Sequence, residues 1–372
     1  MKHIISIILI IGLGTTSFSQ FKKGMNIETI FQFGKIIKHT PELLFDGKGL
    51  TTGFEVNLTW QTYGRKEWHQ FQHYPKIGVG LMVLNMGDRD TMGIAYGIDY
   101  NVTIPLINRK KFRLDGLFAS GFAMLDRPFN RISNPNNNAI GSRLNVIAHM
   151  KFLSSYRFNP NWKLNFGFSF THFSNGAAQL PNFGVNIGSG TLGVTYTPVP
   201  LEPTDFIKHD ISKASAKKFG FRLEYSIGFR ESQTIGGPRY PIKAYSIAGV
   251  YYLNRVNRVF LGSDYEYNRA LYVFGTNVFA FNSDREAFWG ASRITLFVAD
   301  EFVFGNFGAT LQAGYYFGNF SYQLPQPIYF KLIARYYVPI LKKPFTRAFA
   351  GIMLKSHFSV AEYFALNVGL EF

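Results

Sequence analysis

The chain has 372 residues, with 39 Lys and Arg against 23 Asp and Glu, 17% aromatic residues and no cysteine. A sequence that is 47% hydrophobic and only 17% charged is neither a disordered nor a collagen-like protein. Without cysteine it has no disulfide framework, no Cys-ligated zinc or iron–sulfur site, no thiol nucleophile and no lipid-modified N-terminal cysteine.

Residues 1–19 have the features of a cleaved export signal. Lys2 supplies a basic start, residues 4–13 form a short apolar run, and Ser17 and Ser19 make a small-x-small site before position 20. The apolar run is about half the roughly 20 residues that a membrane-spanning helix needs. We therefore expect a protein exported from a bacterial cytoplasm, with a mature chain that begins near residue 20.

Short segments of alternating polarity follow one another along the rest of the chain. A period of two is typical of strands in a transmembrane β-barrel, where one face meets lipid and the other meets the lumen. In the last segment Phe364, Leu366, Val368, Leu370 and Phe372 alternate with smaller or polar residues. The expected strands cover residues 25–37, 51–63, 76–87, 92–105, 112–125, 143–157, 162–174, 185–198, 219–231, 241–253, 258–268, 291–304, 307–318, 328–339, 346–358 and 362–372.

A stretch rich in Pro, Ser, Lys and Asp, residues 200–218, interrupts the strands. It predicts a linker with one helical turn between a first half, residues 20–199, and a second half, residues 219–372. Most even-to-odd connections are short and most odd-to-even connections are long, as expected when the N-terminus is periplasmic. The pattern predicts an all-β, transmembrane antiparallel β-barrel of about 14 to 16 strands, with tandem eight-stranded barrels as the alternative.

The final strand ends on an aromatic residue, Phe372. Such an end resembles the C-terminal signature of bacterial outer-membrane barrels, which their assembly machinery reads. We therefore expect the outer membrane of a Gram-negative bacterium as the location and the barrel assembly machinery as a partner. An exported barrel is not expected to bind nucleic acid.

The strand 162–174 carries a candidate site at its outer end. Its even positions are apolar up to His172 and Ser174, which continue the same row. Because side chains alternate along a strand, both polar groups should face the membrane with that row. Polar groups there are costly unless paired, so they are either functional or mark the headgroup boundary. Two apart on one face, a His and a Ser can form a base–nucleophile pair.

The run from His172 to Gly176, His-Phe-Ser-Asn-Gly, is followed by Pro181-Asn182-x-Gly184-x-Asn186. This segment resembles the active-site segment of the PagL-type lipid A deacylases and their acyloxyacyl hydrolase-like relatives. The resemblance covers roughly residues 25–199. Members are outer-membrane barrels that remove an ester-linked acyl chain from lipid A. The resemblance implies lipid A or lipopolysaccharide as substrate, outer-membrane lipids as surroundings, and no metal or other cofactor.

The resemblance also implies roles for single residues. Ser174 is the expected nucleophile, His172 the general base, Asn182 an oxyanion-stabilising side chain and Asn175 its support. The family's acid, which orients the His, falls at Asn186. An amide there can accept from the imidazole N–H but cannot stabilise the imidazolium by charge. The acyl chain is expected to lie on the aromatic side chains below the site, Phe166, Phe168 and Phe170.

We therefore predict an outer-membrane serine esterase that removes an ester-linked acyl chain from lipid A by Ser/His acyl transfer. The alternative is a non-catalytic outer-membrane barrel, a channel or a structural protein, in which the motif is degenerate, as Asn186 allows. Bulky inward side chains that fill the lumen would oppose a channel, and an open polar lumen would support one.

Two other groupings are not expected to carry chemistry. His357 and Ser359 repeat the His-Phe-Ser run in the second half, but by parity they point into the lumen, and no Pro-Asn pair follows. His69 and His73 have the spacing of metal ligands only if they lie on a helix, and no carboxylate of clear geometry accompanies them. Both are expected to be structural.

Overall fold

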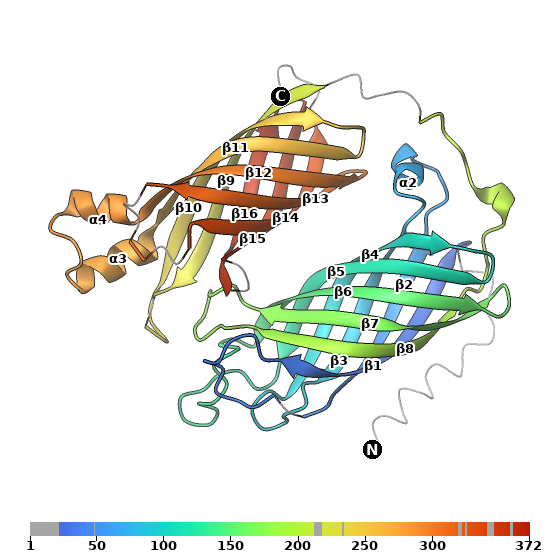
Figure 1. Cartoon of the computed structure of the whole chain (residues 1–372), viewed down its shortest axis with the longest axis horizontal. Helices are drawn as coiled ribbons and strands as arrows, with labels where there is room; N and C mark the ends of the chain where they lie inside the picture. The colour runs from blue at the N-terminus through green and yellow to red at the C-terminus, as the bar shows by residue number, and fades with distance from the viewer. Residues whose placement is uncertain are drawn as a thin grey trace.

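The protein consists of two closed antiparallel barrels of eight strands each (Figure 1). The computed structural model describes residues 22–47, 49–211, 218–232, 234–318, 322–323, 326–340, 346–357 and 360–372. The expected export signal, residues 1–19, lies outside the described residues. The all-β prediction is confirmed, and the tandem arrangement is the correct one of the two predicted closures.

All sixteen expected strands are present, and their ends lie within three residues of the expected ones. The first barrel contains β1 (Met25–Ile37), β2 (Thr51–Gln61), β3 (Lys76–Asn85), β4 (Ile94–Asn108), β5 (Phe112–Leu125), β6 (Leu144–Arg157), β7 (Trp162–Ser174) and β8 (Val185–Tyr196). The second barrel contains β9 (Phe219–Glu231), β10 (Arg239–Tyr252), β11 (Asn257–Asn268), β12 (Ser292–Phe304), β13 (Phe307–Phe317), β14 (Ile328–Pro339), β15 (Arg347–His357) and β16 (Val360–Glu371).

The expectation of a single barrel of about 14 to 16 strands is wrong, because each half closes on itself. Strand β8 pairs with β1, and β16 pairs with β9, so no ladder joins β8 to β9. Eight strands enclose a space that side chains alone can fill, so each half is a complete unit. Between them lies the expected linker, whose helical turn is η2 (Pro203–Asp205). Lys23 holds this turn against the first barrel through Asp205, at 2.6 Å.

Alternation sorts each strand into an apolar outer face and a polar inner face. In β16, Leu366 and Val368 are 63% and 52% exposed, whereas Asn367 and Glu371 are buried in the lumen. The same sorting recurs in other strands of both barrels, where outward side chains such as Phe118 on β5 and Leu311 on β13 are 50% and 56% exposed. This outer surface suits a lipid environment. None of the helices among the described residues has the length and hydropathy needed to cross a membrane.

The lumen of the first barrel is filled by paired charges. Lys76 reaches Glu28 at 2.7 Å, and Lys151 forms an ion pair with Glu55. All four side chains are buried. Buried charges are costly unless they are paired. These pairs join strands that are not neighbours in the sheet, β3 to β1 and β6 to β2, across the lumen.

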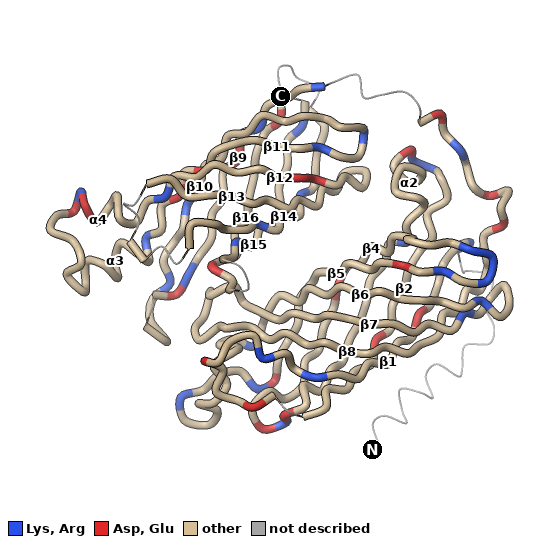
Figure 2. Tube along the Cα trace, viewed as in Figure 1, with Lys and Arg blue, Asp and Glu red and all other residues tan. Residues whose placement is uncertain are grey.

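The lumen of the second barrel also contains paired charges. Figure 2 shows acidic and basic positions spaced along its strands. Glu301 has no exposed surface and accepts from Arg222 at 3.3 Å and from the Tyr337 hydroxyl at 2.6 Å. Further along, Lys331 reaches Asp264 at 2.6 Å. Bulky side chains thus occupy both lumens, which opposes the channel alternative.

Replacing Glu301 with Gln should destabilise the second barrel by about 3 kcal/mol, because a neutral amide leaves buried arginines without their shared anion. Besides Arg222, the carboxylate lies 3.5 Å from both Arg258 and Arg335. Urea titration of the folded protein in lipid vesicles measures the effect. The exposed Glu286, replaced by Gln in the same way, is the control. Equal midpoints for the two variants would contradict the role given to the network.

Three short helices were not predicted from the sequence. Helices α3 (Arg269–Asn277) and α4 (Asp284–Gly290) lie in the long connection between β11 and β12, and α2 (Glu67–Phe71) lies between β2 and β3. The start of α4 carried a readable signal, since the Ser283 hydroxyl accepts from the Glu286 amide. At α2 the two barrels touch, because Arg255 pairs with Glu67 and the Trp68 ring lies 6.0 Å from the Phe304 ring.

The His pair of the first half belongs to this same connection. His69 lies on α2, but the helix ends before His73, which has a left-handed backbone. Burial, with Lys66 nearby, lowers the pKa of His69 to about 4, and its Nδ1 accepts from the Gly64 amide at 3.2 Å. This imidazole nitrogen therefore stabilises the connection between β2 and β3. Within the described ranges, no group of three or more His, Asp or Glu side chains is arranged to hold a metal ion.

Candidate active site

The outer end of β7 presents His172 and Ser174 on the outward side of the first barrel. Phe173, between them, is fully buried in the lumen core, so its two neighbours point the other way, as parity predicts. Ser174 is nevertheless only 1% exposed. It is covered by residues 175–184, the connection from β7 to β8, which we call the site loop.

The hydroxyl of Ser174 lies among hydrogen-bond donors of the site loop. Its Oγ accepts from the Asn182 Nδ2 at 2.9 Å and from the backbone N–H of Gly176 at 3.0 Å. Gly176 has a φ of +60°, which turns its amide back toward the serine. Two N–H groups that converge on one oxygen make a pocket for negative charge, and such pairs stabilise oxyanions.

The orientation of the Asn182 amide is fixed by the chain itself. Its Oδ1 accepts from the backbone N–H of Asn175 at 3.0 Å, which leaves its Nδ2 to face Ser174. The Asn175 side chain in turn donates to the Gln179 carbonyl and to the Ser142 hydroxyl, both at 2.9 Å. Asn175 thus connects the start of the site loop to its middle and to Ser142 outside it, and its backbone N–H holds Asn182 in place.

The imidazole of His172 is paired across the sheet with Asn186. The two residues are direct partners in the β7–β8 ladder, and His172 Nδ1 lies 2.6 Å from Asn186 Oδ1. An amide oxygen accepts only, so Nδ1 carries the proton and Nε2 keeps its lone pair. This is the tautomer that a general base needs. The polar residues that the sequence singled out thus form two hydrogen-bonded groups on one face, His172 with Asn186 and Ser174 with Asn182 and Asn175.

Among the hydrogen bonds of the described residues, none joins Ser174 to His172. The serine Oγ lies toward Asn182 and Gly176, and the imidazole lies along β8 toward Gly184. Catalytic hydrogen bonds of this kind often tighten only when substrate binds, so the separation does not oppose a base–nucleophile pair.

Below the polar residues, the outward row of β7 continues with exposed rings. Phe168 is 75% exposed, and its neighbours Phe166 and Phe170 are 46% and 40% exposed. They form one apolar stripe that runs from the serine toward the middle of the membrane. A stripe of this kind is also an ordinary lipid-facing surface.

Gly184 makes room for the imidazole. A Cβ at this position would lie 2.9 Å from His172 Cε1, and the backbone φ is +77°. Gly184→Ala should therefore displace the ring and lower the rate of the ester hydrolysis that the sequence predicts by about 10-fold or more. Released fatty acid measures the rate. The control is Gly188→Ala, where the added methyl meets only the side-chain end of Ile37. Equal rates for both variants would contradict the placement of His172.

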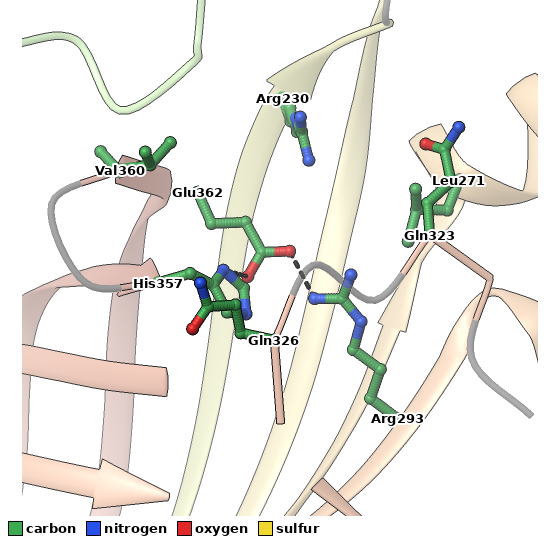
Figure 3. A pocket seen from close by; sticks show the side chains of 9 residues that line it. Arg230, Leu271, Arg293, Gln323, Gln326, His357, Val360 and Glu362 are labelled. Carbon is green, nitrogen blue, oxygen red and sulfur yellow. Dashed lines mark hydrogen bonds and ion pairs between the residues drawn. The ribbon is translucent and has the colours of Figure 1, made fainter. Parts of the chain in front are cut away.

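The second His-Phe-Ser run does not form a comparable site. His357 is buried in the lumen, where its Nε2 lies 2.7 Å from the Tyr316 hydroxyl and its Nδ1 lies 3.6 Å from Glu362. It lines a cavity of about 290 Å³. Figure 3 shows it beside Glu362, which forms an ion pair with Arg293. Ser359 lies outside the described residues. His357 is therefore part of the lumen network, as parity predicts.

Comparison with protein families decides which group the chain belongs to. Residues 52–195 match the model described as lipid A 3-O-deacylase (PagL), and residues 219–372 match the model described as acyloxyacyl hydrolase, C-terminal domain. The chain belongs to the PagL family. The resemblance that the sequence placed on the first half is confirmed, and the second half matches a separate C-terminal domain model. Family and fold point to the outer membrane of a Gram-negative bacterium.

Solved structures that match include other barrels. Neisserial surface protein A is 11% identical, with a TM-score of 0.33, over 47% of this chain and 97% of its own. OccAB1 of Acinetobacter baumannii is 9% identical, with a TM-score of 0.25, over 95% of this chain and 98% of its own. No curated protein matches this PagL-family chain at a significant level.

Sequence reasoning missed some of the groups around Ser174. The Gly176 amide contributes through its backbone, and only the glycine in the His-Phe-Ser-Asn-Gly run could have indicated it. Glu231, from the far end of β9, binds the site loop and carried no signal except a charge at the end of an apolar strand face. Contacts of this kind join distant parts of the chain and leave no local pattern.

Proposed function

We propose that this PagL-family protein is an outer-membrane serine esterase that removes an ester-linked acyl chain from lipid A, at the 3-position that the family description specifies. One observation carries the proposal. Ser174, in a family of lipid A deacylases, lies between two N–H donors, beside a His172–Asn186 pair on the outward wall of the barrel. Export by a signal in residues 1–19 and insertion through the C-terminal strand that ends at Phe372 belong to the same proposal.

The first half-reaction is acyl transfer to the serine. His172 Nε2 takes the proton from Ser174 Oγ, which attacks the ester carbonyl carbon. The tetrahedral intermediate collapses as the bond to the sugar oxygen breaks, and the imidazolium returns its proton to that oxygen. In the second half-reaction, His172 activates a water that hydrolyses the acyl-serine. Lipid A leaves with a free hydroxyl, and the fatty acid leaves as the second product.

The oxyanion is stabilised by the donors that now contact the serine. When the carbonyl oxygen occupies the place between Asn182 Nδ2 and the Gly176 N–H, Oγ is free to turn toward His172. Removing one such donor from a serine hydrolase reduces the rate by about 10²- to 10³-fold. Asn175 holds Asn182 in this position through the site loop.

Asn186 keeps the imidazole in the reactive tautomer by accepting from Nδ1. It lacks the charge that an acid would place beside the imidazolium, so catalysis is slower than with a carboxylate. The acyl chain lies along Phe166, Phe168 and Phe170, which face the lipid from which the substrate comes. The site therefore takes its substrate sideways from the membrane, with no passage through the filled lumen.

Mass spectrometry of lipid A tests the activity. Outer membranes from cells that produce the protein should contain lipid A lighter by one ester-linked acyl chain than membranes from cells that lack it, and fragmentation identifies the position. Unchanged lipid A in cells where the barrel is correctly inserted would favour the non-catalytic alternative.

A further inference from the structure

The second barrel contacts the site loop through the residues where β9 ends and β10 begins. The backbone N–H of Glu231 donates to the Ala177 carbonyl at 3.1 Å, and its carboxylate accepts from the backbone N–H of Leu180. Nearby, Arg239 donates to the Gln179 side chain at 3.1 Å. These contacts fasten the middle of the site loop to β9 and β10, two strands of the other barrel (Figure 1).

Glu231 is an unusual residue for its place on β9. It shares the outward row with Phe221, Leu223 and Phe229, which are 38% to 52% exposed, yet it is only 3% exposed itself. A carboxylate buried on that face is costly unless hydrogen bonds satisfy it. Its two oxygens are satisfied by backbone N–H groups, of Leu180 in the site loop and of Gly236 at 2.9 Å. The burial of this charge therefore depends on the site loop.

The stretch of the site loop that Glu231 contacts, residues 177–180, lies in the chain between Ser174 and its oxyanion donor Asn182. Ala177 follows the nucleophile by three positions, and Leu180 precedes Asn182 by two. The backbone of Gly176 also lies close to the second barrel, since a Cβ at this position would lie 2.3 Å from the ring of Phe364 on β16. The second barrel therefore contacts the site loop at Gly176, whose amide faces Ser174, and at three positions of the following stretch, Ala177, Gln179 and Leu180.

We propose that Glu231 is a positioning residue of the active site, through which the second barrel holds the site loop in the geometry that binds the oxyanion. This inference rests on the proposed esterase function. It gives the second half of the chain a role in catalysis that the first barrel cannot supply alone. A charged acceptor suits the role, because hydrogen bonds from backbone N–H groups to a carboxylate are about twice as strong as those to a neutral group.

The test compares Glu231→Ala and Glu231→Gln with the wild-type protein in detergent micelles that contain lipid A. The Ala variant should lose about 10- to 100-fold in kcat, since a loosened loop misplaces the oxyanion donors. Its KM should change by less than about 3-fold, because the acyl chain binds elsewhere. The kcat of the Gln variant should lie between those of the Ala variant and the wild type, because its amide oxygen still accepts a hydrogen bond from one of the N–H groups.

Glu286→Gln on α4 is the matched control, an exposed glutamate of the same barrel. Heat-dependent mobility on gels verifies that each barrel is folded. If the Ala variant does not fold, a loss of kcat in the Gln variant at unchanged KM decides for the proposal, and an unchanged kcat decides against it. Inactive wild-type protein would overturn the esterase function itself. Active wild type with an equally active, folded Glu231→Ala variant would overturn only the role of Glu231.

Discussion

Ser174→Ala is expected to abolish the release of fatty acid from lipid A by the purified protein, with a rate at least about 10³-fold below that of the wild type. The methyl group cannot attack the ester, while the Asn182 and Gly176 donors and the His172–Asn186 pair stay in place. The loss should therefore fall on kcat. Release of fatty acid, measured by mass spectrometry over time, gives both rates.

Ser120→Ala is the control for this change. Ser120 is an exposed serine on the outward face of β5, on the same barrel but away from the site loop. We expect the wild-type rate from it. A folded Ser174→Ala variant that still releases fatty acid at the wild-type rate would remove Ser174 from the mechanism.

Asn186→Asp is expected to raise kcat by about 10- to 100-fold. The aspartate can keep the contact with His172 Nδ1, now 2.6 Å long, and adds a negative charge beside the imidazolium that forms during the reaction. In a serine protease triad the reverse change lowers the rate by about 10⁴-fold. The expected gain is smaller here because a carboxylate at this buried, outward-facing position is desolvated. Initial rates at saturating lipid A measure it.

Asn186→Leu is the companion variant and should move the rate the other way, since it leaves the tautomer of His172 unfixed. We expect a loss of about 10-fold or more. If the folded Asp variant is no faster than the wild type, the electrostatic role given to position 186 is wrong. If the Leu variant also matches the wild type, Asn186 does not fix the tautomer of the catalytic base.

The strands could be predicted from the sequence because each one carries its own period-two pattern. In β7 the pattern alone predicted both ends and the outward placement of His172 and Ser174, and in β16 it predicted the faces and the ends to within two residues. The same parity placed Asn186 beside His172, which the ladder confirms. Local alternation determines these features, so no knowledge of distant contacts is needed.

The closure of the barrels could not be predicted from the same pattern. The alternation of polar and apolar residues in a strand such as β8 is the same whether the strand pairs with β1 or with β9, because the same face meets the lumen in both cases. The choice depends on which edges meet in space. Helices α3 and α4 were missed because the connection that holds them has no long apolar period, although Ser283 and Glu286 marked one start.

The candidate site was only partly visible in the sequence. The spacing of His172, Ser174, Asn182 and Asn186 was visible, because it lies within two consecutive strands and one loop. The amide of Gly176 and the carboxylate of Glu231 were not, because one acts through the backbone and the other comes from the second barrel. The contacts that set the loop's geometry are therefore those that local sequence patterns do not carry.

The central claim is that Ser174 is the nucleophile on the outer wall of the first barrel. Labelling with a long-chain fluorophosphonate, followed by peptide mass spectrometry, tests it most directly, since the reagent forms a stable bond only with an activated serine. The account predicts one adduct per chain on the peptide that contains Ser174, formed in step with loss of lipid A hydrolysis and slowed by added lipid A. Complete inactivation with the adduct on another residue, or continued hydrolysis after full labelling of Ser174, would contradict it.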